Sequence, residues 1–154
     1  FGYRRKTDFH IEYAVPHQSA ERSKGGVSIF EEDEQRLLYT MNFLKGYRYV
    51  GEFHSHSDGS CALSDFDKQD MLCSGSGVSI LISVQISDKY RRWQYDTKDR
   101  CLYGSIDDSY LVRIKAYRVR PNSRLIMKMR LRCDFITKLN RRIRREKLKV
   151  RRLL

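Results

Sequence analysis

The sequence predicts an α/β (α+β) fold in which one mixed β-sheet is flanked by helices. Residues 78–86 form a nearly continuous β-branched, apolar run, which is typical of a strand buried inside a sheet. Residues 110–119 alternate basic with apolar side chains, as a half-exposed strand does. Between residues 32 and 44, apolar side chains recur at helical spacing instead. Helices and strands are therefore expected to pack together in one layered fold.

The first third of the chain is expected to contain a strand, a loop and a helix. Residues 9–15 alternate well enough for a strand, and a proline ends it. Residues 18–26 are polar and end in paired glycines, so we interpret them as a surface loop. The helix should run from about Glu32 to Leu44. Four acidic residues favour its N-terminus through the helix dipole, and Gly46 follows its last apolar residue.

A second strand and a second helix should follow. Residues 47–53 are rich in aromatic and β-branched side chains, which favours a strand that runs into His54. Residues 57–62 are mostly small and polar, so they should form a loop. Residues 65–73 are then predicted to form the helix.

The second half of the chain should supply the remaining strands and a basic helix. After the buried strand, residues 91–95 should form a hairpin partner and residues 101–103 a further strand. Over residues 121–154 the character changes, since thirteen Lys or Arg accompany only two acids. Apolar residues three, four or seven apart predict a basic amphipathic helix there, with its first half packed on the sheet. The expected division is one domain over 1–120 and this helix over 121–154.

The composition limits the class of protein. The chain has 154 residues, of which 40% are hydrophobic and 12% aromatic, which suits one domain with a modest core. No apolar run approaches the roughly 20 residues of a membrane span. The four cysteines are scattered without a C-x-x-C pair, which favours free thiols in a cytoplasmic, reducing environment. The formal net charge of +12 predicts attraction to an acidic protein surface, nucleic acid or a membrane surface.

Two histidines are the first candidates for chemistry. His54 and His56 are two residues apart, so on a strand both side chains point to the same face. With a carboxylate from the following segment they would offer two nitrogens and one oxygen, the ligand set of a catalytic zinc with an open fourth position. Alternatively, the histidines are polar residues of a solvated face. Ser64 and Asp67 also fit a helix capping box without any metal.

Taken together, these residues resemble the zinc motif of the JAB/MPN/JAMM metalloprotease family. The pattern is His54-x-His56, seven further residues, then Ser64-x-x-Asp67. The resemblance covers most of the chain and implies the MPN/JAB (cytidine deaminase-like) fold of a prokaryotic-type, single-domain member. It also implies that His54, His56 and Asp67 bind Zn²⁺. Ser64 would then stabilise the oxyanion when an activated water attacks the scissile carbonyl.

The same resemblance implies a reaction and a set of partners. Members of the family are deubiquitinase-like isopeptidases that hydrolyse the bond after the C-terminus of ubiquitin or a ubiquitin-like protein. Some prokaryotic members act beside ubiquitin-activating and ubiquitin-conjugating-like enzymes in antiviral defence. The expectation is therefore a cytoplasmic zinc isopeptidase that acts on such conjugates.

The chain departs from the family pattern in two places. Phe1-Gly2 resembles the end of the family's first strand, which places the general-base Glu upstream of Phe1 and predicts impaired turnover for this chain. Ser57 stands where many relatives have proline, which is expected to loosen the following loop. Cys61 is expected to be neither ligand nor nucleophile, because the ligand set is complete without it.

Two functions of other classes stay open. One is a catalytically silent binding module of the same fold. The other is a protein that binds nucleic acid or an acidic partner through the basic helix, with Arg141, Arg142, Arg144 and Arg145 as the candidate contacts. Bound zinc discriminates the isopeptidase from the nucleic-acid-binding protein.

Overall fold

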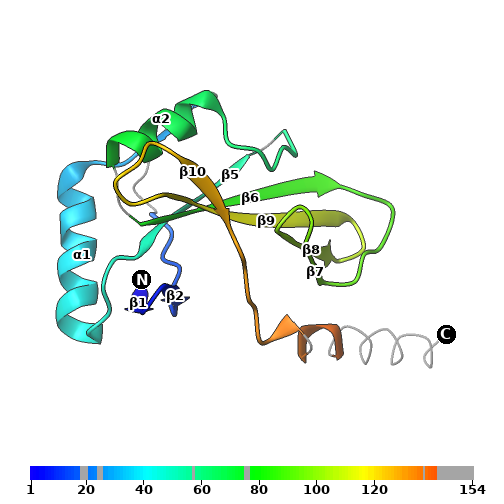
Figure 1. Ribbon diagram of the computed structural model, residues 1–154. Coiled ribbons are helices and arrows are strands. Elements are labelled where there is room, and N and C mark those ends of the chain that lie inside the picture. The colour runs from blue at the N-terminus through cyan, green and yellow to red at the C-terminus, as the bar shows by residue number, and fades with distance from the viewer. Residues whose placement is uncertain (18–20, 24–25, 57, 75–76, 137, 142–154) are drawn as a thin grey trace. The chain divides into compact units, whose positions relative to one another are not determined.

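The computed structural model describes residues 1–17, 21–23, 26–56, 58–74, 77–136 and 138–141 (Figure 1). Over these residues the chain divides into two compact units, Phe1–Gly51 and Glu52–Leu154.

Two short hairpins open the first unit. Their antiparallel strands are β1 (Gly2–Arg5) with β2 (Asp8–Ile11), and β3 (Glu21–Ser23) with β4 (Gly26–Ser28). Lys6, in the turn between β1 and β2, has a φ of 56°, the left-handed conformation that tight hairpin turns use. The predicted strand at 9–15 is therefore shorter than expected. The prediction of a loop over 18–26 is wrong at residues 21–23 and 26, which pair as strands because an antiparallel partner is close in sequence.

Helix α1 (Glu31–Lys45) confirms the predicted helix to within one residue at each end. Acidic side chains fill its first turn, where the helix dipole favours negative charge. Gly46 follows with a φ of 67°, a left-handed C-cap that glycine adopts without strain. Among the residues of this unit whose burial the structure describes, the buried apolar ones are Phe1, Met41 and Val50.

The main sheet has six strands in the order β5-β6-β9-β8-β7, with β10 also paired to β9 (Figure 1). Their bounds are β5 (Gly51–His56), β6 (Val78–Ile86), β7 (Gln94–Asp96), β8 (Cys101–Ile106), β9 (Tyr110–Val119) and β10 (Ile126–Met129). Strand β9 pairs antiparallel with β6, β8 and β10. The sheet is mixed, and with its helices it confirms the predicted α+β class.

One face of the sheet packs against the helix that connects β5 to β6. Helix α2 (Asp65–Ser74) confirms the helix predicted at 65–73 and buries Met71. Met71 contacts a core formed with Leu81 of β6 and Tyr117 of β9, which are 0% and 5% exposed. This packing holds α2 against strands β6 and β9.

Three strand predictions need correction. Strand β5 begins at Gly51, later than the predicted 47–53, and includes both histidines. Strand β7 pairs with β8 and not with β6, so residues 91–95 are not the hairpin partner of the buried strand. Strand β6 is only half buried, since its last three residues are exposed.

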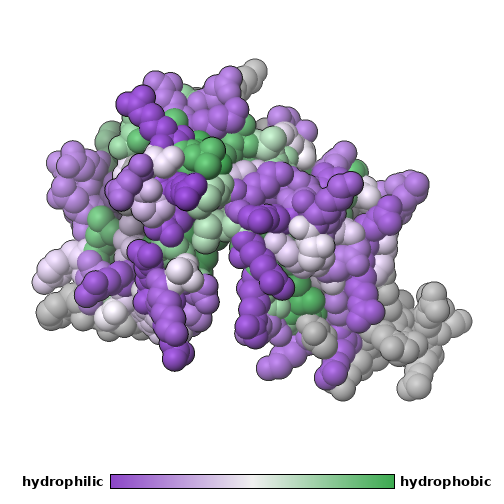
Figure 2. All heavy atoms as spheres, viewed as in Figure 1, coloured by the Kyte–Doolittle hydropathy of each residue, from purple (hydrophilic) through white to green (hydrophobic). Residues whose placement is uncertain are grey.

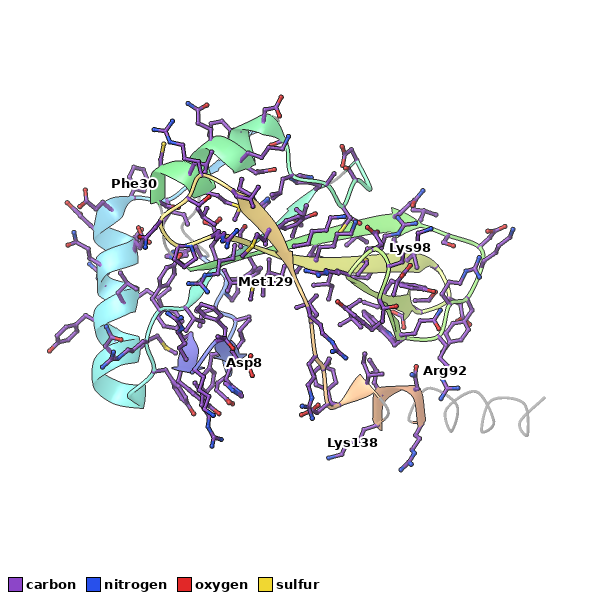
Figure 3. All side chains as sticks on the ribbon, viewed as in Figure 1. Asp8, Phe30, Arg92, Lys98, Met129 and Lys138 are labelled. Carbon is purple, nitrogen blue, oxygen red and sulfur yellow. The ribbon has the colours of Figure 1, made fainter. Side chains whose placement is uncertain are left out.

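The basic helix predicted over 121–154 is wrong in its first part. Residues Ile126–Met129 form β10, whose Ile126 pairs with Val119 of β9. These residues form a strand because β9 extends past the end of its partner β8. The backbone groups of β9 beyond that point pair with residues 126–129. Residues 136 and 138–141 are helical. Figure 3 labels Met129, the last residue of β10, and Lys138, one of these helical residues.

The surface of the molecule agrees with its high charge. Hydrophilic side chains dominate the face that Figure 2 shows, with smaller hydrophobic areas between them. This matches a charged fraction of 32%. None of the helices in the described ranges is both long and apolar enough to cross a membrane.

Asn140 joins the C-terminal helical residues to the backbone of Trp93, the residue before β7. Its Oδ1 accepts a hydrogen bond from the Trp93 N–H at 3.1 Å, and its Nδ2 donates to the Trp93 carbonyl at 2.9 Å. Asn140 is 7% exposed, so Asn140→Ala would leave two backbone groups without partners. We expect the substitution to lower the free energy of unfolding by about 1–3 kcal/mol. Urea unfolding followed by fluorescence of Trp93, the single tryptophan, measures this.

Two further variants separate this effect from a general loss of side chain. Asn140→Asp keeps the size and the acceptor of the side chain but places a buried carboxylate oxygen against the Trp93 carbonyl, so near neutral pH its effect should be at least as large. Lys138→Ala changes an exposed side chain on the same helical residues, and its effect should stay within about 0.5 kcal/mol. Equal destabilisation by Asn140→Ala and Lys138→Ala would contradict the prediction.

Candidate metal centre

Strand β5 brings the two candidate histidines together. The ring centroids of His54 and His56 lie 5.3 Å apart, with 46° between the ring planes. Their side chains are 29% and 19% exposed, so both are half buried. This does not fit the alternative of two polar residues on a solvated face. The period of two along a strand therefore places both imidazoles at one point, as predicted.

Asp67 is held in position by the N-terminus of α2. The N–H and the hydroxyl of Ser64 both donate to Asp67 Oδ2, each at 2.7 Å. In return, the Asp67 N–H donates to Ser64 Oγ at 3.1 Å. This reciprocal pair is a capping box, which satisfies donors at the helix start and fixes the carboxylate. The capping role expected for Ser64 and Asp67 is present in the structure.

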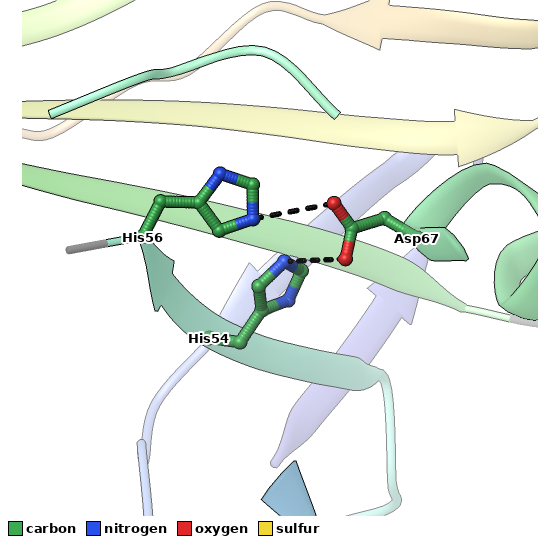
Figure 4. Close-up of side chains that lie close together, drawn as sticks. All are labelled: His54, His56 and Asp67. Carbon is green, nitrogen blue, oxygen red and sulfur yellow. Dashed lines mark ion pairs between the residues drawn. The ribbon is translucent and has the colours of Figure 1, made fainter. Parts of the chain in front are cut away.

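The fixed carboxylate faces both imidazoles (Figure 4). His54 Nε2 lies 3.3 Å from Asp67 Oδ1, and His56 Nε2 lies 3.2 Å from Asp67 Oδ2. One ligand atom from each of the three residues can be chosen so that all lie within 4.8 Å of one another. No second group of this kind occurs in the part of the chain that the structure describes.

These distances fit a small divalent metal ion. Zinc binds nitrogen and oxygen ligands at about 2.0–2.2 Å, so two ligands of a tetrahedral zinc lie roughly 3.3 Å apart. The distances from His54 Nε2 and His56 Nε2 to the carboxylate oxygens of Asp67, 3.3 and 3.2 Å, agree with this separation. The donor set of two imidazoles and one carboxylate is also one that catalytic zinc sites use.

One nitrogen of the site has no other use. His54 Nε2 is buried and has no hydrogen-bond partner within the described ranges, because its approach to Asp67 lacks hydrogen-bond geometry. A buried polar atom without a hydrogen-bond partner is energetically unfavourable, so such an atom often marks the position of a bound ligand or ion. A metal ion at this point would satisfy it. The residues present therefore fit the metal.

The charge of Asp67 also favours a cation. Burial would raise the pKa of its carboxyl group, yet this pKa lies below its ordinary value. The hydroxyl and N–H of Ser64 stabilise the charged form, and His54 and His56 add to this effect. The carboxylate is therefore ionised near neutral pH, as a metal ligand must be.

The remaining predicted residues divide into two groups. Ser64 borders the site, but its hydroxyl donates to Asp67, so its role toward an oxyanion stays a prediction. No glutamate of the described residues joins the metal group, and the general base also stays a prediction. Arg141 is helical and exposed, whereas Arg142, Arg144 and Arg145 lie outside the described residues.

The sequence prediction missed a polar cluster inside the sheet. Lys115, predicted on a half-exposed strand, is 8% exposed, and its Nζ lies 2.7 Å from Asp99 Oδ2. The Cys61 thiol lies 4.0 Å from the Leu81 carbonyl oxygen, and the Cys101 thiol lies 3.6 Å from the Leu102 carbonyl oxygen. No signal in the sequence pairs these residues, because the two cysteines stand far apart and outside any recognised spacing.

The structure thus defines a candidate three-ligand metal centre built on a strand and a helix start of an α+β fold. No protein-family model matches this chain, and neither do any curated proteins or solved structures.

Proposed function

We propose that this chain is a zinc-dependent isopeptidase or peptidase that acts after the C-terminus of ubiquitin or a ubiquitin-like protein. The observation that carries the proposal is the convergence of His54, His56 and Asp67, with ligand atoms within 4.8 Å. The substrate class rests on the resemblance of the motif to the JAB/MPN/JAMM family. The metal site and the substrate class are therefore supported by separate arguments.

Each residue of the site has a defined task in this proposal. His54 and His56 donate their Nε2 atoms to the ion, and Asp67 donates a carboxylate oxygen. The Ser64 N–H and hydroxyl both hold Asp67, and the N–H alone would keep it in place when the hydroxyl turns from Asp67 Oδ2 toward a substrate oxygen. Bound zinc would supply Lewis-acid activation of water and of the scissile carbonyl near neutral pH.

Ser64 is proposed to donate a hydrogen bond to the oxyanion that develops on the substrate carbonyl. Loss of one such donor typically lowers kcat about 10²–10³-fold. A carboxylate base, typically contributing about 10²–10⁴-fold, is not among the residues that converge here. The proposed activity of this chain is accordingly slow.

The partners belong to the same proposal. We place the chain in the cytoplasm, with ubiquitin-like conjugates as substrates and ubiquitin-activating or ubiquitin-conjugating-like enzymes beside it. The net charge of +12 favours an acidic partner surface, with exposed Arg141 among the candidate contacts. A silent binding module of the same fold is the alternative, and the activity assay below separates the two.

The test is cleavage of ubiquitin-like fusions by the zinc-loaded chain. Mass spectrometry after long incubation should find a cut directly after the last residue of the ubiquitin-like part, and a chelator should abolish it. Ser64→Ala should lower the rate by about 10²–10³-fold while bound zinc is retained. Zinc without cleavage of any fusion would overturn the isopeptidase in favour of the binding module.

A conservative variant separates catalysis from capping. Ser64→Ala also removes a helix cap, which typically costs about 1 kcal/mol of stability. Ser64→Thr keeps the hydroxyl and should keep most of the rate. A loss of rate that follows the unfolding midpoint in both variants would make Ser64 a structural residue only.

A further inference from the structure

Two basic segments that are far apart in sequence meet at Asn140. Its side chain forms two hydrogen bonds with the backbone of Trp93, at 3.1 and 2.9 Å, so the residues before Trp93 lie beside the C-terminal helical residues. Four exposed cations flank these hydrogen bonds, and we call them the basic junction: Arg91, Arg92, Lys138 and Arg141. Figure 3 labels one cation from each segment, Arg92 and Lys138.

Strand β8 holds the first segment in place. The Arg91 N–H donates to the Ser105 hydroxyl at 2.7 Å, and the Ser105 N–H donates to the Arg91 carbonyl at 2.8 Å. The Trp93 ring packs so closely on Gly104 that a Cβ at this glycine would collide with it. The backbone of the segment is therefore fixed on the sheet, while the side chains of Arg91 and Arg92 are exposed.

The helical residues add an exposed stripe to this surface. The Leu139 N–H donates to the Phe135 carbonyl at 2.9 Å, so Phe135 stands one helical turn before Leu139. Residues three apart are neighbours on a helix, which aligns Phe135, Lys138 and Arg141. All three are exposed, whereas Leu139 is half buried and Asn140 is buried. Phe135 is 63% exposed, an unusual position for a large apolar ring.

The charge of the basic junction is not neutralised by nearby acids. Within the described ranges, none of its four cations forms an ion pair. Asp134, the acid that precedes Phe135, lies 2.8 Å from Arg132 Nε instead. Unpaired like charges gathered in one place produce a positive potential that attracts an anionic partner.

The side chains present favour one kind of anion. Three of the four cations are arginines, whose planar guanidinium groups match phosphate oxygens in a bidentate geometry. Phe135 offers an exposed ring beside them, and aromatic rings bind unpaired bases by stacking. In a duplex the faces of the bases are covered by their neighbours. An acidic protein would use the cations but has no group that requires the ring.

We propose that the basic junction binds a single strand of nucleic acid. Its cations contact successive phosphates, and one base stacks on Phe135. DNA and RNA share both contacts, so the sugar is not part of this recognition. The proposal is independent of the metal centre and of peptidase activity, and its readouts involve neither.

The test is fluorescence anisotropy of a labelled oligothymidylate of about twelve nucleotides, titrated with the full chain in the presence of a chelator. Each phosphate contact on a single strand contributes about −0.7 to the slope of the logarithm of the association constant against the logarithm of salt concentration. Four contacts predict a slope of about −2.8 or steeper, which is roughly a fiftyfold loss of affinity between about 50 and 200 mM salt. No binding at about 50 mM salt would overturn the proposal.

Paired substitutions test the two segments separately. Arg91→Gln with Arg92→Gln removes two charges from the first segment, and Lys138→Gln with Arg141→Gln removes two from the helical residues. Each pair should make the slope shallower by about 1.4, because two phosphate contacts are lost. A slope that stays at the value of the parent in both pairs would contradict the assignment.

The turn between β9 and β10 supplies a matched control. Arg120→Gln with Arg124→Gln also removes two exposed charges, but these residues follow the end of β9. The basic junction lies beside Ser105, whose partner Leu111 is near the beginning of that ten-residue strand. The control pair should keep the slope of the parent. Equal losses in all three pairs would attribute the binding to net charge alone and overturn the proposal.

Phe135→Ala separates stacking from charge. It should weaken binding of the single strand roughly tenfold with an unchanged salt slope, whereas Phe135→Tyr keeps a ring and should bind like the parent. Binding to a duplex should not respond, because paired bases cannot stack on the ring. Unchanged single-strand affinity in Phe135→Ala, or tighter binding of a polyglutamate peptide than of the oligonucleotide, would overturn the proposal. Urea unfolding of each variant checks the fold.

Discussion

Replacing His56 by alanine is expected to reduce bound zinc from about one ion per chain to almost none. His56 Nε2 supplies one of three protein ligands and lies 3.2 Å from the carboxylate oxygen that would share the ion. Loss of an outer-shell partner alone typically costs 10–100-fold in affinity, roughly, and a direct ligand should cost more. Elemental analysis of chain purified without chelator, followed by titration with zinc, measures the effect.

The chain offers two matched controls for this prediction. His10 lies on β2, stacks on Tyr3 with ring centroids 4.6 Å apart, and is not one of the three residues of the metal group, so His10→Ala should retain zinc. Asp65 stands in the same helical turn as Asp67, but it pairs with Lys68 at 2.7 Å and faces solvent. Asp65→Asn should therefore retain zinc, whereas Asp67→Asn should lose it.

Zinc should also stabilise the fold. An ion that binds only the folded chain adds about 2.7 kcal/mol at a concentration 100 times its Kd. The parent and the two control variants should gain this stability, and His56→Ala should not. A parent that holds no zinc after equilibration with excess ion would disprove the metal centre. The basic C-terminal residues would then be the leading feature of the molecule.

Replacing Leu81 by alanine is expected to lower the free energy of unfolding by roughly 2–5 kcal/mol. Leu81 is 0% exposed and packs between Met71 of α2 and Tyr117 of β9, so its loss opens a cavity at the centre of the core. The size of the effect depends on how far Leu63 and Ile126, which border the cluster, can move into the space. Urea unfolding followed by Trp93 fluorescence reports on the unit that contains both residues.

Leu72 provides the control for this substitution. It follows Met71 on α2 and is 38% exposed, so Leu72→Ala removes the same atoms from a position that water already reaches. The loss should be about 1 kcal/mol or less. Equal effects of the two substitutions would mean that Leu81 is not the centre of the core.

Local patterns determined much of this fold before any contact was considered. Helix α1 follows from helical spacing with an acidic start and a glycine stop, and the described helix ends within one residue of the prediction. Strands β6 and β9 follow from β-branched and alternating side chains. The metal group also has a local origin. A period of two aligns His54 with His56, and a capping box of four consecutive residues orients Asp67.

Other features depend on tertiary structure, because the residues concerned interact with partners that are distant in sequence. Residues 126–129 suit a helix by spacing, but the open edge of β9 offers hydrogen bonds that make them a strand. Lys115 alternates like a surface residue, yet it is buried because Asp99 lies beside its ammonium group. Cys61 lies in the connection before α2, and its thiol is 4.0 Å from the Leu81 carbonyl oxygen of β6, a contact that no local spacing indicates. Sequence periodicity reports which face a side chain takes, whereas strand pairing and distant ion pairs depend on which segments the fold brings side by side.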